Sequence, residues 1–252
     1  MKGGWKIAVQ GLVRRAGYQI RKLEPDTSLV DPYQEQRRLA PEATMIFEVG
    51  AADGRDCDIY RGMFPGATVH AFEPLPENFK KLAVRAAADP SIKAHQLALS
   101  DSAGTATFHI GAWADSSSLL PAKDTGSTFD AYQATVGTIE VKTDMLDALA
   151  AAHGVQTIDI LKMDAQGAEL AILHGAAGLL ASGGIRLIYT EAQFRPLYQG
   201  AGTFAEIASY LAGYGFVLHN LFDIHHNQHG EACWCDALFV RSGERDGGAA
   251  RA

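Results

Sequence analysis

A short apolar run that ends at two glycines is the feature that most constrains what this chain can fold into. Residues 45–49 read Met-Ile-Phe-Glu-Val, and Gly50 and Gly54 follow before a helical pattern begins. Glycine lets the backbone turn sharply and leaves no Cβ between the backbone and a bound molecule, and the next helix presents unpaired N–H groups at its start. The pattern predicts a strand, a tight ligand-binding turn and a helix.

The residues around these glycines indicate the charge of the ligand. A dinucleotide-binding turn has the spacing G-x-G-x-x-G, and a phosphate loop has G-x-x-x-x-G-K-[ST]. Neither follows this strand; instead Glu48 precedes the turn and Asp53 lies within it. Carboxylates there oppose a pyrophosphate but suit a cation. S-adenosylmethionine carries a sulfonium and an ammonium, so we expect it as the cofactor; a plain strand–turn–helix corner is the alternative.

A second acid follows at the interval expected for a ribose contact. Residues 67–73 alternate as a strand and end at Glu73, which Pro74 follows. An acid about 20 residues after a glycine turn, at the tip of the second strand, is placed to accept hydrogen bonds from a ribose diol. The glycine turn and Glu73 together predict an adenosine-binding site.

Strand and helix patterns alternate along the rest of the chain. Helices are expected at 31–39, 56–63, 76–88, 144–153, 166–181 and 203–213, and further strands at 92–99, 105–110, 137–142, 157–164, 185–191, 216–221 and 236–240. The last two strands are joined without a helix and must therefore be antiparallel. We expect an α/β domain over residues 31–242, with a Rossmann-like, seven-stranded, mostly parallel sheet that has one antiparallel strand and helices on both faces.

Composition limits the remaining possibilities. The chain has 252 residues, is 47% hydrophobic and has no apolar run near 18 residues, so we expect no membrane span. Three cysteines are too few for a disulfide framework, which indicates reduced thiols and a cytoplasmic location. The net charge is −7, and six basic residues and no acids in residues 1–22 leave −13 for the remainder. Such an acidic body excludes nucleic acid as a partner.

Both termini are expected to lie outside the main domain. In residues 1–22, apolar side chains recur at helical spacing opposite basic ones, so residues 1–30 are expected to form a basic helical extension. This helix could contact a membrane surface peripherally, but packing on its own domain or on a second subunit of a homo-oligomer is the favoured interpretation. Residues 243–252 have the composition of a disordered tail.

Candidate catalytic groups follow the later strands. Asp164 and Glu191 end two predicted strands, as Glu48 and Glu73 end the first two, and ligands bind at the carboxyl ends of parallel strands. Asp164 and Glu191 could hold Mg²⁺ with Gln193 or a loop histidine. A histidine base, His225 or His226, is the other route to an activated acceptor. A zinc site from the set His225, His229, Cys233 and Cys235 is weaker, because it lacks paired C-x-x-C spacing.

Four stretches resemble the FkbM family of S-adenosylmethionine-dependent methyltransferases: Glu48–Gly54, Phe72–Pro74, Ala98–Asp101 and, most specifically, Asp159–Glu169. The resemblance runs from about residue 30 to 241, and Glu48 stands where the family usually has Asp. It implies the class I methyltransferase fold. By position it implies that Glu48, Gly50 and Asp53 line the methionine end, Glu73 the ribose and Asp101 the adenine, while Gly54, Leu99, Ser100 and Asp164 complete the cofactor site.

The resemblance also implies methyl transfer to a hydroxyl of a sugar, a glycan or a polyketide-like natural product. A carboxyl- or N-methyltransferase acting on a peptide or small molecule is an alternative, as is a cofactor-binding scaffold without catalytic activity. The segments 111–135 and 223–235, together with the N-terminal helix, are expected to select the acceptor.

Overall fold

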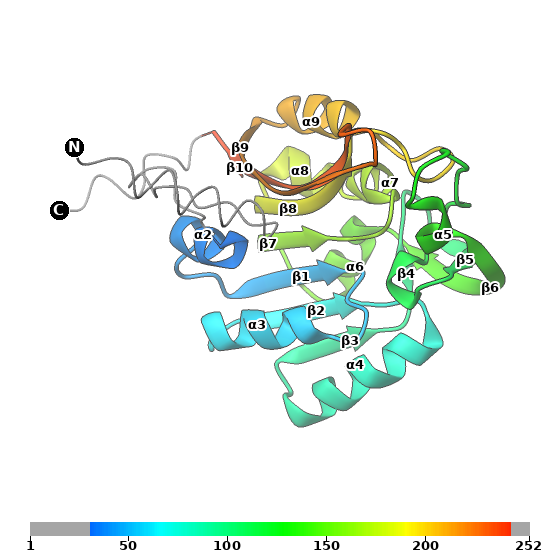
Figure 1. The fold of residues 1–252 in the computed structure, drawn as a ribbon. Coiled ribbons are helices and arrows are strands. Elements are labelled where there is room, and N and C mark those ends of the chain that lie inside the picture. The colour runs from blue at the N-terminus through cyan, green and yellow to red at the C-terminus, as the bar shows by residue number, and fades with distance from the viewer. Residues whose placement is uncertain (1–30, 243–252) are drawn as a thin grey trace, which may run out of the picture. The chain divides into compact units, whose positions relative to one another are not determined.

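A computed structural model describes residues 31–242 of the chain. The basic helix expected in residues 1–30 and the tail at 243–252 lie outside the described residues. The elements, coloured along the chain in Figure 1, are α2 (Pro32–Leu39), β1 (Met45–Val49), α3 (Arg55–Met63), β2 (Thr68–Phe72), α4 (Pro76–Ala88), β3 (Ile92–His95), β4 (Ala98–Leu99), β5 (Gly104–Gly111), η1 (Ala114–Ser116), α5 (Asp130–Gln133), β6 (Thr135–Asp144), α6 (Leu146–Ala152), β7 (Ile158–Met163), α7 (Glu169–His174), α8 (Ala177–Ser182), β8 (Ile185–Gln193), α9 (Phe204–Ala212), β9 (Phe216–His226) and β10 (Ala232–Arg241).

The main sheet has the strand order β3-β2-β1-β7-β8-β10-β9. Neighbours from β3 to β8 are parallel, whereas β10 is antiparallel to both β8 and β9. The first strand, β1, lies in the middle of the sheet. The strands β2 and β3 follow on one side of it, and β7 lies on the other side. The expected seven-stranded, mostly parallel sheet with one reversed strand is confirmed, and this is the class I methyltransferase topology.

Burial explains why the central strands are almost continuously apolar. Every residue of β7 is buried, as are four of the five residues of β1. Strands covered on both faces cannot alternate polar and apolar residues, because each side chain meets a packed layer. In Figure 1, α3 and α4 lie on one side of the sheet, whereas α6 to α9 cover the other, where α6 contacts α8 and α7 contacts α9.

A second, three-stranded sheet has the order β4-β6-β5. The single strand expected at 92–99 divides into β3, which pairs with β2, and β4, which pairs with β6. The strands expected near 105–110 and 137–142 are β5 and β6, and they pair with each other rather than with the main sheet. Their shared core, built from Leu75, Ala98, Phe108 and Val141, places this small sheet beside the end of β2.

Two other expectations need correction. The helix expected at 166–181 is divided into α7 and α8 at Gly175, where a Cβ would lie 2.2 Å from the backbone oxygen of Ser100. The loop expected at 223–235 is much shorter, because β9 and β10 continue as a hairpin closed by residues 227–231. Sequence patterns missed the extension because its outer residues are exposed and polar.

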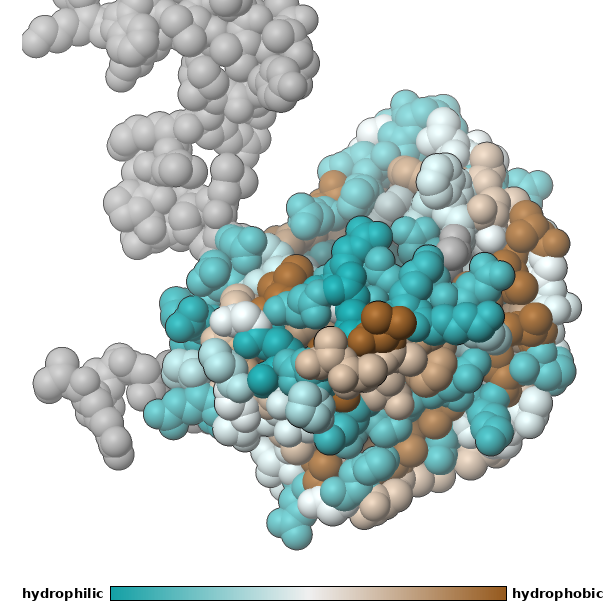
Figure 2. All heavy atoms as spheres, turned by 90° about the horizontal axis from the view of Figure 1, so that it is seen from below, coloured by the Kyte–Doolittle hydropathy of each residue, from teal (hydrophilic) through white to brown (hydrophobic). Residues whose placement is uncertain are grey.

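The face of the protein on the α4 side carries both hydrophobic and hydrophilic residues (Figure 2). Within residues 31–242, no helix combines the length and apolar composition needed to cross a bilayer. Figure 2 views the protein from the side on which α4 lies, and it shows hydrophobic residues scattered among hydrophilic ones. The exposed apolar side chains of α3 and α4 include Ile59 and Val84. Isolated exposed apolar residues of this kind are ordinary for a folded protein.

Candidate active site

The glycine turn after β1 has the strained backbone that its sequence predicts. Gly50 has φ +76°, Ala52 +46° and Gly54 +81°, all in the left-handed region that favours glycine. A Cβ on Gly50 would lie 1.8 Å from the backbone oxygen of Asp164, at the end of β7. The turn therefore depends on glycine at position 50, and it brings the ends of β1 and β7 into main-chain contact.

Glu73 is fixed at the end of β2 by the glycine turn itself. Its Oε2 accepts a hydrogen bond from the Ala52 N–H at 2.9 Å, and its Oε1 accepts one from the Leu75 N–H at 2.7 Å. The side chain is only 5% exposed, and burial raises the pKa of Glu73 to about 7 against the opposing effect of those two N–H groups. A carboxylate held in one orientation suits the recognition of a ribose diol.

Glu48 and Lys162 form a buried charged group under the turn. Glu48 Oε2 accepts a hydrogen bond from Cys57 Sγ at 2.9 Å, whereas Oε1 is buried without a hydrogen-bond partner and lies 3.9 Å from Lys162 Nζ. Burial raises the pKa of Glu48 to about 7. Burial also works against the charge of Lys162, but Asp164, Glu48 and Asp56 hold its pKa well above the usual value. The unpartnered Oε1 fits a cationic ligand group such as an ammonium.

Two neighbouring cavities meet above this turn. The first is lined by Val49, Gly50, Ala52, Phe72, Glu73, Pro74, Asn78, Leu97, Ala98, Leu99, Phe108, Asp115, Ser117, Leu119, Asp164, Ala165, Gln166 and Ala168. The second is lined by Glu48, Ala51, Ala52, Asp53, Arg55, Asp56, Asn78, Lys81, Trp113, Asp115, Lys162 and Asp164. The shared residues Ala52, Asn78, Asp115 and Asp164 make the cavities contiguous. The first is mainly apolar and the second is rich in acids, which fits a donor with an adenosine part and a charged amino-acid part.

Most of the expected cofactor residues line these cavities. Glu48, Gly50, Asp53, Glu73, Leu99 and Asp164 are among them. Gly54 lies just outside, where it caps α3 and where a Cβ would approach Leu82 and Arg85 within 3.0 Å. Ser100 and Asp101 line neither cavity, and the exposed Asp101 accepts hydrogen bonds from the hydroxyls of Ser100 and Ser102. Leu97 and Ala98 face the first cavity instead.

Gln166 connects the acids at the ends of β7 and β8, a role that sequence reasoning missed. Its Nε2 donates to Asp164 Oδ1 at 2.8 Å and lies 3.4 Å from Glu191 Oε2. Its backbone oxygen accepts a hydrogen bond from Ser118 Oγ, and its Oε1 lies 2.9 Å from the Tyr198 hydroxyl. The left-handed backbone of Gln166, with φ +53°, allows all these contacts. The signal was its place in the stretch Lys-Met-Asp-Ala-Gln-Gly-Ala-Glu at 162–169.

Glu191 lies among other carboxyl groups. Burial, followed by the charges of Asp164, Glu169 and Asp236, raises the pKa of Glu191 well above its usual value. Gln193 Nε2 lies 3.4 Å from Glu191 Oε1. Asp164 and Glu191 do offer the oxygen ligands that Mg²⁺ prefers. A metal ion at this position would have to displace the bridging amide of Gln166 and bind a carboxyl group whose charged form burial disfavours.

The histidines expected to act as bases lie on the hairpin. His225 and His226 are exposed at the end of β9, and neither lines the two cavities. The His225 ring stacks on Trp234 with centroids 4.5 Å apart. The four residues of the expected zinc site, which include Cys233 and Cys235, do not come together as a ligand group. Within residues 31–242, the three-ligand group consists of His70, His95 and His153 instead.

An exposed aromatic pair borders the acid-rich cavity and was not foreseen. Trp113 lines this cavity although 63% of its surface is exposed, and its ring stacks on Tyr132 with centroids 6.0 Å apart. Asp115, which lines both cavities, lies close enough to Tyr132 to raise the pKa of its hydroxyl, after the larger effect of burial. Both aromatics belong to the segment 111–135, and no regular spacing in the sequence marks them as partners. The segment that was expected to select the acceptor thus contributes an aromatic residue to the lining of this cavity.

Comparisons with known proteins agree with this geometry. Residues 48–218 match the family described as the methyltransferase FkbM domain. The 2-O-methyltransferase NoeI of Sinorhizobium fredii is 29% identical over 207 residues, which cover 79% of this chain and 83% of NoeI.

Solved structures with a similar fold include a methyltransferase FkbM from Methylobacillus flagellatus, at 16% identity and a TM-score of 0.49. That match covers 79% of this chain but only 43% of the other, so this chain spans less than half of that protein's length. The N-terminal domain of EvdMO1, solved in the presence of SAH and D-fucose, is 13% identical with a TM-score of 0.43, and the match covers 94% of this chain and 97% of that domain.

Proposed function

Because this chain belongs to the FkbM methyltransferase family and is therefore an S-adenosylmethionine-dependent methyltransferase, we propose that it methylates a hydroxyl group of a sugar. The acceptor is a free sugar, a glycan or a glycosylated natural product. NoeI, a relative named as a 2-O-methyltransferase, supports oxygen as the receiving atom. The donor binds across the two cavities, with its ribose at Glu73 and its amino-acid end near Glu48 and Asp53.

The stacked pair Trp113 and Tyr132 is the observation that carries the choice of a sugar. The two rings together present an exposed aromatic surface at the rim of an active-site cavity. Exposed apolar patches of this kind mark binding sites for ligands or partners. Aromatic rings pack against the C–H faces of sugars, and an adjacent carboxylate accepts hydrogen bonds from sugar hydroxyls. Asp115 supplies that carboxylate beside Tyr132 and lines both cavities.

Asp164 is the group best placed to receive the acceptor's proton. The sulfonium of the donor supplies an activated methyl group, so the protein must align the hydroxyl oxygen and accept its proton as the new C–O bond forms and the S–C bond breaks. The Asp164 side chain is 43% exposed, lines both cavities and is oriented by the Gln166 amide. Asp164 thus serves both the donor site and proton transfer.

Loss of the aromatic platform tests the acceptor class. Replacing Trp113 with Ala should raise KM for a sugar acceptor by about threefold to tenfold, because ring stacking contributes roughly 0.5–1.5 kcal/mol. Transfer of a labelled methyl group from the donor to a panel of methyl glycosides and nucleotide sugars measures this. Trp113→Phe is the matched control and should retain most of the affinity. Labelling of peptide carboxylates or amines, with none of the sugars labelled, would contradict the proposal.

Three ways of activating the acceptor can be separated with the same assay. If Asp164 is the base, Asp164→Asn should lower kcat by about 10²–10⁴-fold, the usual contribution of general base catalysis. The double variant His225→Gln/His226→Gln should then keep its activity, and so should enzyme treated with EDTA. Loss of activity with EDTA, restored by Mg²⁺, would favour a metal ion held by Asp164 and Glu191. Loss of activity in the histidine variant alone would favour the histidine base.

A further inference from the structure

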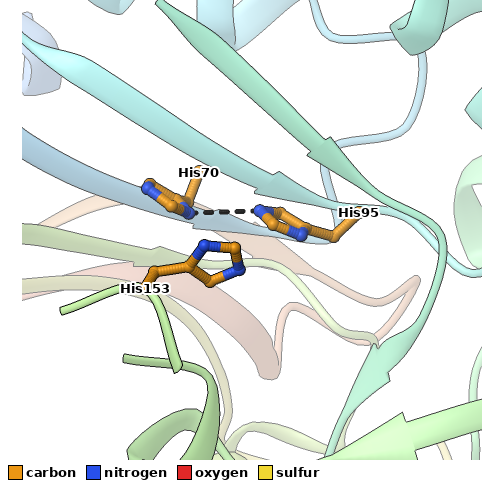
Figure 3. A group of neighbouring side chains, drawn as sticks. All are labelled: His70, His95 and His153. Atoms are coloured by element: carbon orange, nitrogen blue, oxygen red, sulfur yellow. Dashed lines mark hydrogen bonds between the residues drawn. The ribbon is translucent and has the colours of Figure 1, made fainter. Parts of the chain in front are cut away.

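Three histidines come together outside the two cavities that adjoin the glycine turn. His70 belongs to β2, His95 ends the edge strand β3, and His153 follows α6. Their possible ligand atoms all lie within 4.8 Å of one another. Figure 3 shows the rings of His70 and His95 in line, with His153 approaching the pair from one side.

The first two rings already have the spacing of two ligands on one metal ion. His70 Nδ1 and His95 Nε2 are 3.1 Å apart and share a hydrogen bond, so at least one of these nitrogens has a free lone pair directed at the other. Two nitrogens bound to zinc at about 2.0–2.1 Å stand at a similar separation. A metal ion would replace the shared proton, with a tilt of the rings that turns both lone pairs toward it.

Aromatic packing holds both rings in these positions. Phe47 stacks on His70 with centroids 4.8 Å apart, and Phe72 stacks on His95 at 4.7 Å. His70 is only 5% exposed. His153 is exposed and meets both other rings edge-on, with centroids 5.0 Å from each. Two ligands are therefore fixed in advance, and the third is free to adjust.

The cavity is open to a cation, and binding there depends on the imidazole nitrogens rather than on opposite charge. All three histidines line an open cavity at the β3 edge of the sheet, and Lys93 is the charged residue in its lining. The ammonium of Lys93 is hydrogen-bonded to the backbone oxygen of Pro90 at 2.7 Å. Imidazole nitrogens suit zinc and similar transition metals, whereas Mg²⁺ and Ca²⁺ prefer oxygen ligands.

We propose that His70, His95 and His153 bind a transition-metal cation of the zinc class, with water in the remaining coordination position. The ion joins the edge strand β3 to β2 and to the end of α6, and so stabilises this side of the sheet. The proposal is independent of the methyl-transfer proposal, since none of the three histidines lines the donor cavities.

Zinc binding to the full chain without an affinity tag tests this inference. Calorimetry at pH 7.5 should give one Zn²⁺ per chain with about micromolar or tighter affinity, and zinc should raise the melting temperature while Mg²⁺ leaves it unchanged. His153→Gln should weaken zinc binding by at least about tenfold, since loss of even an outer-shell partner costs 10–100-fold. His174→Gln is the control, because His174 is also exposed but packs against Tyr210 elsewhere, and it should bind zinc like the wild type.

Two results would overturn the site. One is the absence of zinc binding by the wild-type protein at micromolar concentrations. The other is equal affinity in the wild type and His153→Gln, which would place any bound zinc elsewhere. Because His153 is exposed, its replacement leaves the packed core intact, and the measurement does not depend on the buried His70 or His95. Activity is not needed as a readout.

Discussion

Glu73 shows how a single residue can couple the folding of this protein to pH. Its folded pKa is raised from 4.5 to about 7, chiefly by burial. Between these pH values the folded state binds more protons than the unfolded state, so the stability that Glu73 contributes is complete below about pH 4.5 and is lost as the pH rises through about 7. His70 and His95 act in the opposite direction, because burial lowers their pKa from 6.5 to about 4.

Replacing Glu73 with Gln isolates this contribution. The free energy of unfolding of the wild type, relative to that of Glu73→Gln, should fall by up to about 3 kcal/mol between pH 4.5 and 8, because one pKa unit corresponds to about 1.4 kcal/mol. Urea denaturation of both proteins without cofactor, over a series of pH values, measures the difference. The histidine contributions are common to both proteins and cancel. Two curves that stay parallel over this range would show that Glu73 does not titrate as described.

For single residues, the sequence was informative where a function requires a particular residue type at a fixed distance along the chain from another. Gly50 was predictable because a tight turn requires glycine. Glu73 was predictable at the end of the second strand, where an acid fits the ribose contact that we propose. Trp113 was not, since its importance comes from exposure beside a cavity, which spacing does not reveal. His70 escaped notice for a similar reason. It lies in an ordinary strand pattern, and its partners His95 and His153 come from other elements.

Among the elements, the segment between β8 and α9 connects the turn after β7, which holds Gln166, to the segment 111–135. The hydroxyl of Tyr198 lies 2.9 Å from both the backbone oxygen of Ser116 and Gln166 Oε1, and it donates its proton to one of them at a time. Tyr198 is 2% exposed. Gly167 also packs against this segment, where an added Cβ would lie 2.8 Å from Ala201 Cβ. Gln166 and Gly167 are therefore held in place by the segment between β8 and α9.

Removing the Tyr198 hydroxyl should affect catalysis more than donor binding. Tyr198→Phe should lower the free energy of unfolding by about 0.5–1.5 kcal/mol, the usual net value of one hydrogen bond. It should also lower kcat, because Gln166 loses a contact that orients it towards Asp164, while the dissociation constant of the donor stays close to that of the wild type. Denaturation, steady-state kinetics and donor calorimetry provide the three readouts. An unchanged kcat would mean that Gln166 is held by its other contacts alone.

For the whole molecule, the mostly parallel sheet and its one reversed strand followed from the sequence, since buried parallel strands and short hairpins leave clear patterns. The division into two sheets did not follow. Residues 92–99 read as one continuous strand, and only the pairing of Ala98 and Leu99 with β6 shows that the stretch serves both sheets. The extent of the β9–β10 hairpin was hidden as well, because exposed polar strands resemble loops.

The contact between Gly50 and the backbone oxygen of Asp164 also bears on how such an enzyme can diversify. The atoms that a Cβ on Gly50 would meet belong to the backbone of Asp164 and Ala165. A larger residue at position 50 therefore cannot be accommodated by changing a neighbouring side chain. Substitution of Gly50 is therefore strongly disfavoured in the part of the site where we propose that the donor binds. Under the acceptor site that we propose, an engineer could exchange the segment 111–135 between relatives to change the acceptor while leaving the glycine turn untouched.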